Sequence, residues 1–258
     1  MNPKPSVLAY RELIKNLVLK DLKLKYRDSV LGFLWSLANP LLLILVYSFV
    51  FQHILRAGTP NFPFFLLVGI LPWNFFSQSL MMSTGSILDN GALIRKVAVP
   101  MEVFPLATVF FNLAQYLLAL TIFFPAVIFL FGVSIGWSWV AFFPVLALQV
   151  LFTLGLSFLL SAATVFYRDI RHFTEVLLTL LFWLTPIVYD LETVPQSLKA
   201  VVYANPLTYF ILAYQDILYR GEFVALDRLL AVIAFTLLSL VCGYFLFVAC
   251  RIRFAEEV

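Results

Sequence analysis

The sequence predicts an all-α protein that crosses a membrane several times. Of its 258 residues, 63% are apolar and 12% are charged, whereas soluble domains average roughly half apolar and a quarter charged. The charged residues are also unevenly spaced and leave long stretches without Asp, Glu, Lys or Arg. Because a charge at the centre of a bilayer costs about 3 kcal/mol, these stretches locate the candidate membrane spans.

The lengths of the uncharged stretches predict six spans. Residues 103–167 form the longest stretch, which holds two helices because about 20 apolar residues cross a bilayer. Residues 29–55, 57–88 and 229–250 hold one helix each, and the apolar run from Phe173 to Tyr189 adds a shorter sixth. The spans expected on this basis are residues 31–55, 62–86, 103–131, 139–165, 173–190 and 229–250.

The basic residues predict the orientation of these spans. With the amino terminus in the cytoplasm, 13 of the 17 Lys and Arg residues face the cytoplasm, and only Arg56, Lys199, Arg220 and Arg228 lie outside. The positive-inside rule therefore favours an even number of spans with both termini cytoplasmic. The net charge of +3 follows from this topology, and a nucleic-acid partner is not expected because no basic patch on a soluble surface is predicted.

Two segments do not have the pattern of a span. Residues 6–28 place apolar and basic side chains on different faces of a helix, which predicts an amphipathic helix. Two roles stay open for it, as an interfacial anchor on anionic lipid or as a docking surface for a cytoplasmic partner. Within residues 192–220, the run 200–215 is apolar but too short for a span and is broken by Asn205 and Pro206, so we expect short re-entrant helices on the external side.

The sequence contains no motif for coupling to an ion gradient or for binding ATP. No charged residue lies near the middle of a predicted span, so proton or ion coupling lacks a carrier. No G-x-x-x-x-G-K-[ST] loop is present, so any ATP, with its Mg²⁺, must bind to a second polypeptide. Motifs for metal binding or hydrolysis are also missing, and we expect neither a cofactor nor catalytic residues in this chain.

Polar and aromatic residues gather in two of the predicted spans. Flat aromatic rings and uncharged polar groups suit the apolar faces and hydroxyl edges of sugars, so these clusters are candidates for a sugar pathway. Helix packing around the nearby prolines is an equally simple explanation. On the fourth span, Gly155, Ser157 and Ser161 indicate close helix packing. The candidate pathway residues are Trp73, Asn74, Phe76, Gln78, Trp183 and Tyr189.

Five segments together resemble the permease subunits of type-2 ABC exporters, in the branch that exports O-antigen, capsule or teichoic-acid polymers. The segments are residues 25–42, 69–80, 93–105, 166–189 and 203–219. The resemblance implies a homodimeric channel in a bacterial inner membrane, which works with two copies of a cytoplasmic ABC ATPase to export a lipid-linked polysaccharide.

The resemblance also implies roles for individual residues. The helix over 6–28 is similar to an interface helix and carries Lys15, Lys20, Lys23 and Arg27. Residues 88–100 are similar to a gate or coupling helix, and Arg168 and Asp169 to a second cytoplasmic contact. Ordinary loop charge would also explain the charges at these positions, and Glu102 has Arg95 and Lys96 as candidate partners. The expected site residues are Leu93, Arg95, Lys96, Arg168 and Asp169 for ATPase coupling, and Asn205, Pro206 and Tyr209 for an external gate.

Two alternatives remain. The first keeps the family but changes the cargo to a drug, a small lipid or a haem-like molecule. The second is a polytopic membrane transferase, which would need a cluster of His or acidic residues at one membrane face, and the sequence offers none.

Overall fold

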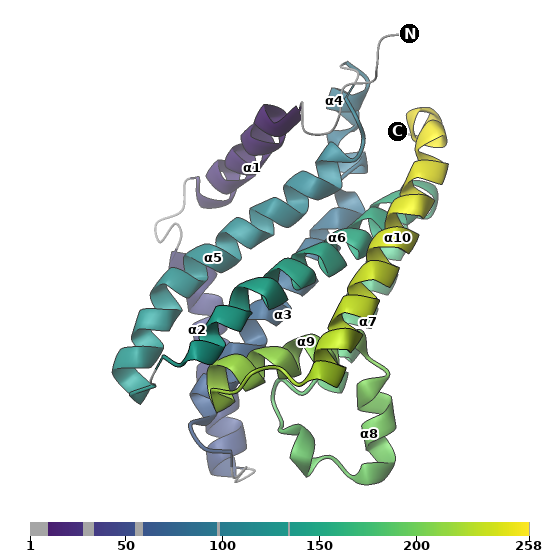
Figure 1. Cartoon of the computed structure of the whole chain (residues 1–258). Helices are drawn as coiled ribbons and strands as arrows, with labels where there is room; N and C mark the ends of the chain where they lie inside the picture. Colours follow the sequence, from purple (N-terminus) through teal and green to yellow (C-terminus); the bar gives the residue numbers. More distant parts are fainter. Residues whose placement is uncertain (1–9, 28–33, 55–58, 97–98, 134, 258) are drawn as a thin grey trace.

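The computed structural model describes residues 10–27, 34–54, 59–96, 99–133 and 135–257. Within these ranges the chain is helical and contains no strand, which confirms the predicted all-α fold (Figure 1). In chain order the elements are α1 (Arg11–Tyr26), α2 (Leu34–Ser48), η2 (Phe49–Ile54), α3 (Phe62–Gly85), η3 (Leu88–Asn90), α4 (Gly91–Ile94), α5 (Val103–Phe131), η4 (Trp137–Ala141), α6 (Phe142–Phe166), α7 (Ile170–Leu184), η5 (Leu191–Thr193), α8 (Gln196–Tyr203), α9 (Pro206–Tyr214), η6 (Gln215–Arg220) and α10 (Leu226–Glu257).

Four helices among the described residues are long and apolar enough to cross a membrane. They cover Phe62–Gly85, Val103–Ala126, Trp137–Phe166 and Leu226–Arg251. The first predicted span corresponds to a shorter apolar helix, Ala38–Ile54. The fifth corresponds to α7, which has 15 residues and is therefore about 22 Å long.

Two predicted helices are shorter in the structure than the sequence suggested. The helix expected over residues 173–190 ends at Leu184, because Thr185 precedes a proline and takes an extended conformation with ψ of 136°. The segment expected as a helix over 88–100 is helical only from Leu88 to Ile94 among its described residues.

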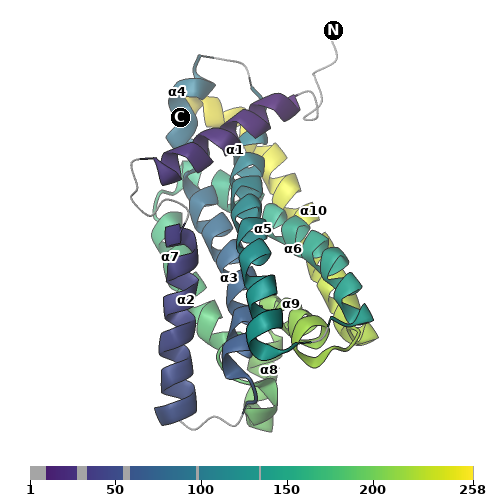
Figure 2. The same ribbon diagram turned by 90° about the vertical axis from the view of Figure 1, so that its left-hand side faces the viewer.

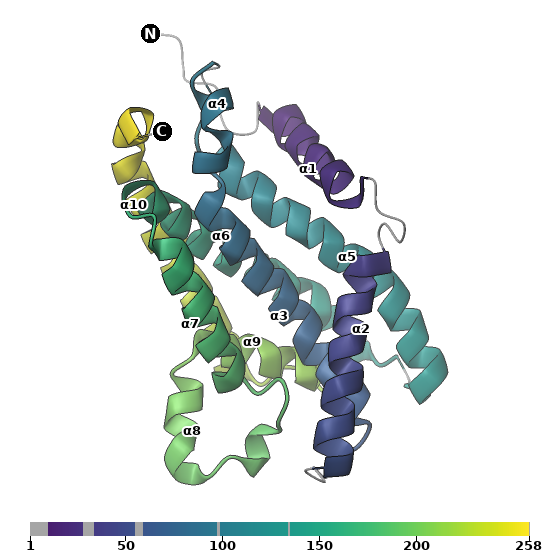
Figure 3. The ribbon, with the colours of Figure 1, turned by 180° about the vertical axis from the view of Figure 1, so that it is seen from behind.

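Helix α3 forms the centre of the molecule. Most of its side chains are buried, and Phe65, Leu66 and Phe76 are almost fully inaccessible. The surrounding helices α2, α5, α6, α7 and α9 all contact it, as the view from behind illustrates (Figure 3). Apolar side chains all round a helix are typical of a fully buried element.

The backbones of helices α6 and α10 approach each other closely at two glycines. A Cβ atom added to Gly155 would lie 2.4 Å from the backbone of Ser239, and one added to Gly243 would lie 1.9 Å from the Gly155 carbonyl oxygen. Ser239 donates a hydrogen bond of 2.7 Å to the Phe152 carbonyl across this contact. The prediction that Gly155 serves close helix packing is therefore confirmed.

The molecule has two distinct ends. Helices α1 and α4 lie at one end with the last turns of α10, and we refer to it as the α4 end (Figures 1 and 2). Helix α8 lies at the opposite end, with α9 beside it, and we refer to it as the α8 end.

Candidate functional site

At the α4 end, the apolar face of α1 packs against the rest of the chain. Leu17 is buried against Val103, Phe104 and Ala107 at the beginning of α5. Leu93 of α4 joins the same cluster. The amphipathic helix is therefore docked on the protein through its apolar side, and it contacts both the segment predicted to couple and the helix that follows it.

The segment between α3 and α5 also contacts α6 and α10. Ile87 is buried with Phe158 of α6 and with Phe247 and Phe254 of α10. Ile94 and Met101 pack against both this cluster and the α1 cluster. Ile94 and Met101 thus connect the cluster that contains α1 to the cluster at the end of α10.

An ion pair ties the same segment to α10. Arg251 donates a hydrogen bond of 2.8 Å to the carboxylate of Glu102. Glu102 is only 4% exposed, and it directly precedes α5. Of the partners considered for Glu102 from the sequence, the structure brings neither Arg95 nor Lys96 to it but instead Arg251, which lies 149 positions away.

The charged residues predicted to contact an ATPase lie on the surface of this end. Arg95 and Lys96 follow α4 and are exposed, and Arg168 and Asp169 are exposed in the turn between α6 and α7. Phe166, just before that turn, packs in the cluster that contains Leu88 and Ile94. The two charged pairs therefore flank one apolar cluster, where a partner surface can reach both.

Several basic side chains at and after α1 lie away from its buried face. Lys15 is exposed and pairs with Glu12 at 3.8 Å. Lys20, Lys23 and Arg27 line a shallow groove of about 470 Å³ together with Asn16, Leu19 and Leu24.

Lys25 makes a contact that the sequence did not indicate. Its ammonium group donates a hydrogen bond to the Gln115 side chain on α5 and lies 5.8 Å from the centre of the Phe111 ring. Partial burial against α5 lowers the pKa of this amine. No local pattern marks Lys25, because its partner is 90 positions away.

Two of the aromatic residues predicted for a pathway, Trp73 and Phe76, belong to a continuous row of rings. Trp73 of α3 contacts Phe182 of α7 edge-on at 5.5 Å, and Phe182 stacks on Tyr47 of α2 at 6.2 Å. On its other side, Trp73 lies 6.0 Å from Phe76, whose ring stacks on Phe152 of α6 at 5.8 Å. The row crosses the bundle and links four helices.

Burial divides the predicted pathway residues into two groups. Trp73 and Phe76 are buried within the chain, and Asn74 is partly buried on the same helix. Gln78 and Trp183 are exposed, and Trp183 has 54% of its surface accessible. Tyr189 is partly buried and donates a hydrogen bond of 3.2 Å to the Trp183 carbonyl. Only the exposed group can contact a ligand from the surface of a single chain.

At the α8 end, polar side chains fix the segment that follows α7. Asn205 accepts a hydrogen bond from the Leu207 amide and so caps α9. Its side-chain amide donates to the Thr185 hydroxyl at 2.8 Å, and Gln215 donates to the Pro186 carbonyl at 2.7 Å.

The other two residues predicted for the gate lie beside this network. Pro206 occupies the first turn of α9. Tyr209 packs between Tyr203 and Phe235, with ring centres 5.7 Å away in each case.

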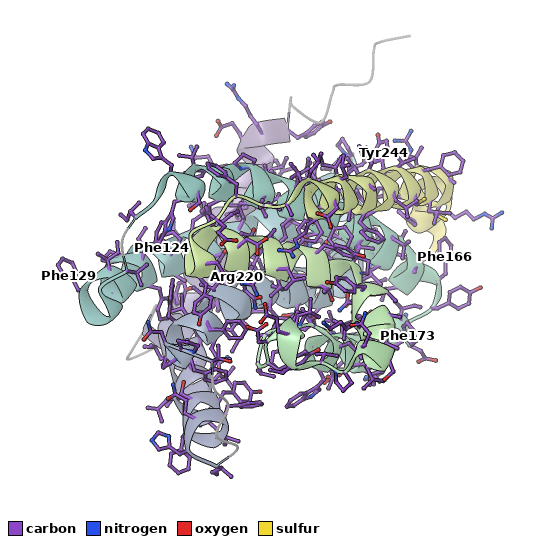
Figure 4. The ribbon with its side chains drawn as sticks, turned by 60° about the horizontal axis from the view of Figure 1, so that its bottom comes forward. Phe124, Phe129, Phe166, Phe173, Arg220 and Tyr244 are labelled. Atoms are coloured by element: carbon purple, nitrogen blue, oxygen red, sulfur yellow. The ribbon has the colours of Figure 1, made fainter. Side chains whose placement is uncertain are left out.

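An ion network next to this segment was missed from the sequence. The buried Asp216 accepts a hydrogen bond of 2.9 Å from Arg220 and a second from Arg228 of α10. Arg220 also lies 3.7 Å from Asp190. Figure 4 places Arg220 among the helices of this end, whereas Phe129 and Tyr244 lie at the periphery. The i, i+4 spacing of Asp216 and Arg220 was the one signal available.

Among the described residues, no group of three or more His, Cys, Asp or Glu side chains is arranged to hold a metal ion. The polar groups brought together at both ends form ion pairs and helix caps, which position helices. A bundle of long apolar helices with docked charged segments at one end is typical of a multi-pass membrane transport protein.

Comparison with known proteins identifies the family. Residues 12–219 match the ABC-2 type transporter family. The chain is 38% identical over 255 residues to the O-antigen export system permease protein RfbA of Myxococcus xanthus, with 96% of each chain covered. It is 35% identical to the protein of the same name from Klebsiella pneumoniae (92% and 91% covered), and 25% identical to the polysialic acid transport protein KpsM of Escherichia coli (91% and 92% covered). The chain belongs to the ABC-2 type transporter family.

Proposed function

We propose that this chain is the membrane permease subunit of an ATP-driven exporter of a lipid-linked, O-antigen-like polysaccharide. The observation that carries the proposal is its identity of 38% with an O-antigen export permease over 96% of both chains. The relative at 25% identity is named for polysialic acid transport, which also favours a polysaccharide over a drug or a small lipid as cargo.

The complex would contain two copies of this chain and two copies of a cytoplasmic ABC ATPase. The chain has no P-loop, so ATP and Mg²⁺ would bind to the partner. The permease would lie in the bacterial inner membrane with six spans and both termini in the cytoplasm, which makes the α4 end cytoplasmic and the α8 end external. This assignment is supported by the exposed basic residues Arg95, Lys96 and Arg168 at the α4 end.

The ATPase would act on the α4 end. Leu93, Arg95, Lys96, Arg168 and Asp169 would form the contact. Ile94 and Met101 pack in the two apolar clusters that contain α1 and the end of α10. A displacement of α4 would therefore move α1 and the end of α10. Packed elements transmit such displacements because interiors have low compressibility.

The cargo would pass along the surface that carries Gln78 and Trp183, between two copies of the chain. Asn205, Pro206 and Tyr209 would form an external gate with the re-entrant α8 and α9. Two hydrogen bonds support this role, because Asn205 and Gln215 hold the residues after α7 directly (2.8 and 2.7 Å). A shift of α9 would therefore move the adjoining end of α7.

The test joins the permease to a candidate ATPase in lipid nanodiscs and measures ATP hydrolysis with and without a lipid-linked polysaccharide. We expect the two proteins to co-purify and the polysaccharide to stimulate hydrolysis. The variant Arg95→Ala/Lys96→Ala should weaken ATPase binding or abolish the stimulation. The matched control is Arg95→Lys/Lys96→Arg, which keeps both charges and should behave as the wild type.

Two results would overturn the proposal. One is that no ABC ATPase binds the chain. The other is that the chain alone transfers a sugar or acyl group to a lipid, which would make it a membrane transferase. If binding and stimulation are normal in Arg95→Ala/Lys96→Ala, the exporter assignment stands and the coupling role of this pair is wrong.

A further inference from the structure

The outward face of α1 combines basic and apolar side chains in one groove. Lys20, Lys23 and Arg27 line it with Asn16, Leu19 and Leu24. Asp21 lies beside it and contacts Lys20 at 3.3 Å. Three of the six residues that line the groove are thus basic. The two leucines are exposed, at 42% and 57%, so the groove offers both cationic and apolar contact.

The apolar face of α1 does not explain this composition. Leu17 is already buried against the beginning of α5, and Leu13, Ile14 and Val18 are partly buried in the same cluster. An interfacial helix usually holds the membrane through its apolar face, but here that face is occupied. Any contact of α1 with lipid must therefore use the groove side, where long basic side chains stand next to exposed leucines.

The position of the groove along α5 indicates whether a lipid or a soluble protein can reach it. Lys25, on the same half of α1, reaches Gln115, which lies 12 residues after the beginning of α5 and thus about 18 Å along its axis. Gln115 belongs to the candidate span Val103–Ala126. The groove therefore lies beside the spanning part of α5, not beyond its end, and α1 runs from α4 towards the beginning of α2 (Figures 1 and 3).

We propose that the groove lined by Lys20, Lys23 and Arg27 binds an anionic phospholipid of the adjoining leaflet. The phosphate group would lie against the basic side chains, and the upper part of the acyl chains would cover Leu19 and Leu24. Basic residues close to an anionic membrane surface are attracted to it. A soluble ATPase surface is disfavoured as the occupant, because it would have to reach past the beginning of α5 into the headgroup region.

The test measures lipid selectivity in the purified full-length protein. The protein in detergent is titrated with phosphatidylglycerol or phosphatidylcholine, and native mass spectrometry counts the retained lipids. We expect the wild type to retain phosphatidylglycerol preferentially, and this preference to fall about thirtyfold in Lys20→Gln/Lys23→Gln. The control Arg11→Gln/Lys15→Gln removes the same charge from exposed positions of the same helix outside the groove, so it should keep the preference.

The proposal would be overturned if the groove variant kept the wild-type preference for phosphatidylglycerol. It would also be overturned if both double variants lost this preference equally, because the overall charge of α1 would then explain the binding. A third contrary result is a groove variant that keeps its lipid but no longer binds the ATPase, which would make the partner protein the occupant. The measurement needs neither ATP nor polysaccharide. Its failure would therefore leave the proposed export function untouched.

Discussion

The carboxylate of Glu102 and the guanidinium of Arg251 meet at 2.8 Å although 149 positions separate them. The pair is unequal in its surroundings, because the Glu102 side chain is 5% exposed and that of Arg251 is 40% exposed. Each apolar cluster of the α4 end contains Met101, the residue before Glu102. The pair thus fixes the end of α10 to the junction between the coupling segment and α5.

This inequality predicts that the two partners respond differently to neutral substitution. Arg251→Gln leaves a buried carboxylate with a weaker donor and should destabilise the protein by about 1–3 kcal/mol. Glu102→Gln leaves an arginine that can turn to water, so its cost should be smaller. Thermal unfolding in detergent, followed by tryptophan fluorescence, measures both. Arg253→Gln, an exposed change on the same helix, should have little effect. Equal losses for Arg251→Gln and Glu102→Gln would contradict this account.

The contact between α6 and α10 predicts strict size limits at two glycines. Gly155→Ala and Gly243→Ala should each destabilise the protein by about 1–3 kcal/mol, since each new methyl group would meet backbone that cannot move aside. Gly136→Ala is the control, because its Cβ would lie 3.5 Å from the nearest atom, the Ser138 hydroxyl oxygen. The fraction of protein that elutes as a single folded species after mild heating measures the effect. If Gly243→Ala keeps the folded fraction of the wild type, α6 and α10 must be farther apart than described above.

The helices were predicted correctly where a long uncharged stretch is enough to define them. Long uncharged stretches must be helical in a bilayer because the backbone has no other partner, and the stretch 229–250 falls within α10. The end of α7 was also foreseeable from Pro186, since the residue before a proline avoids the helical region. The span expected to reach residue 190 ignored this local signal.

The contacts between distant segments could not be predicted in the same way. Glu102 has basic neighbours in the sequence, but its partner is on α10. From the sequence, Lys25 is expected to be a surface residue of an amphipathic helix, but its ammonium group contacts Gln115 on α5. Such pairs depend on how the helices pack, and the hydrophobic pattern sets only which face of each helix is buried.

A buried polar network within the bundle predicts non-additive mutational effects. Gln149 of α6 donates to the Pro72 carbonyl at 3.0 Å and accepts from the Tyr214 hydroxyl at 2.7 Å. Gln149→Leu would leave the Tyr214 hydroxyl buried without this partner, at a cost of about 1–3 kcal/mol. Adding Tyr214→Phe removes the unpaired group, so the double variant should be less destabilised than the sum of the single variants. Unfolding measurements on all four proteins complete the cycle, and strict additivity would argue against the hydrogen bond.

The ion network at the α8 end predicts a local change in dynamics. Asp216 is buried and accepts from both Arg220 and Arg228, so it joins η6 to the beginning of α10. Asp216→Asn removes the negative charge that the Arg220 and Arg228 guanidinium groups share, so that these two groups repel each other. We expect faster amide hydrogen exchange in residues 206–220 and unchanged exchange in α6, as measured by mass spectrometry in detergent.

The control for this change is Asp227→Asn, which removes an equal charge from an exposed position in the first turn of α10. It should leave exchange in residues 206–220 at the wild-type rate, because an exposed carboxylate at a helix beginning contributes only about 0.3–1 kcal/mol to that helix. Equal acceleration in both variants would mean that overall charge at this end, and not the Asp216 pairing, holds α9 and η6 in place. If exchange rises only in Asp216→Asn, the pairing of Asp216 with the two arginines holds residues 206–220 in place. Export assays on that variant then test whether these residues act as a gate.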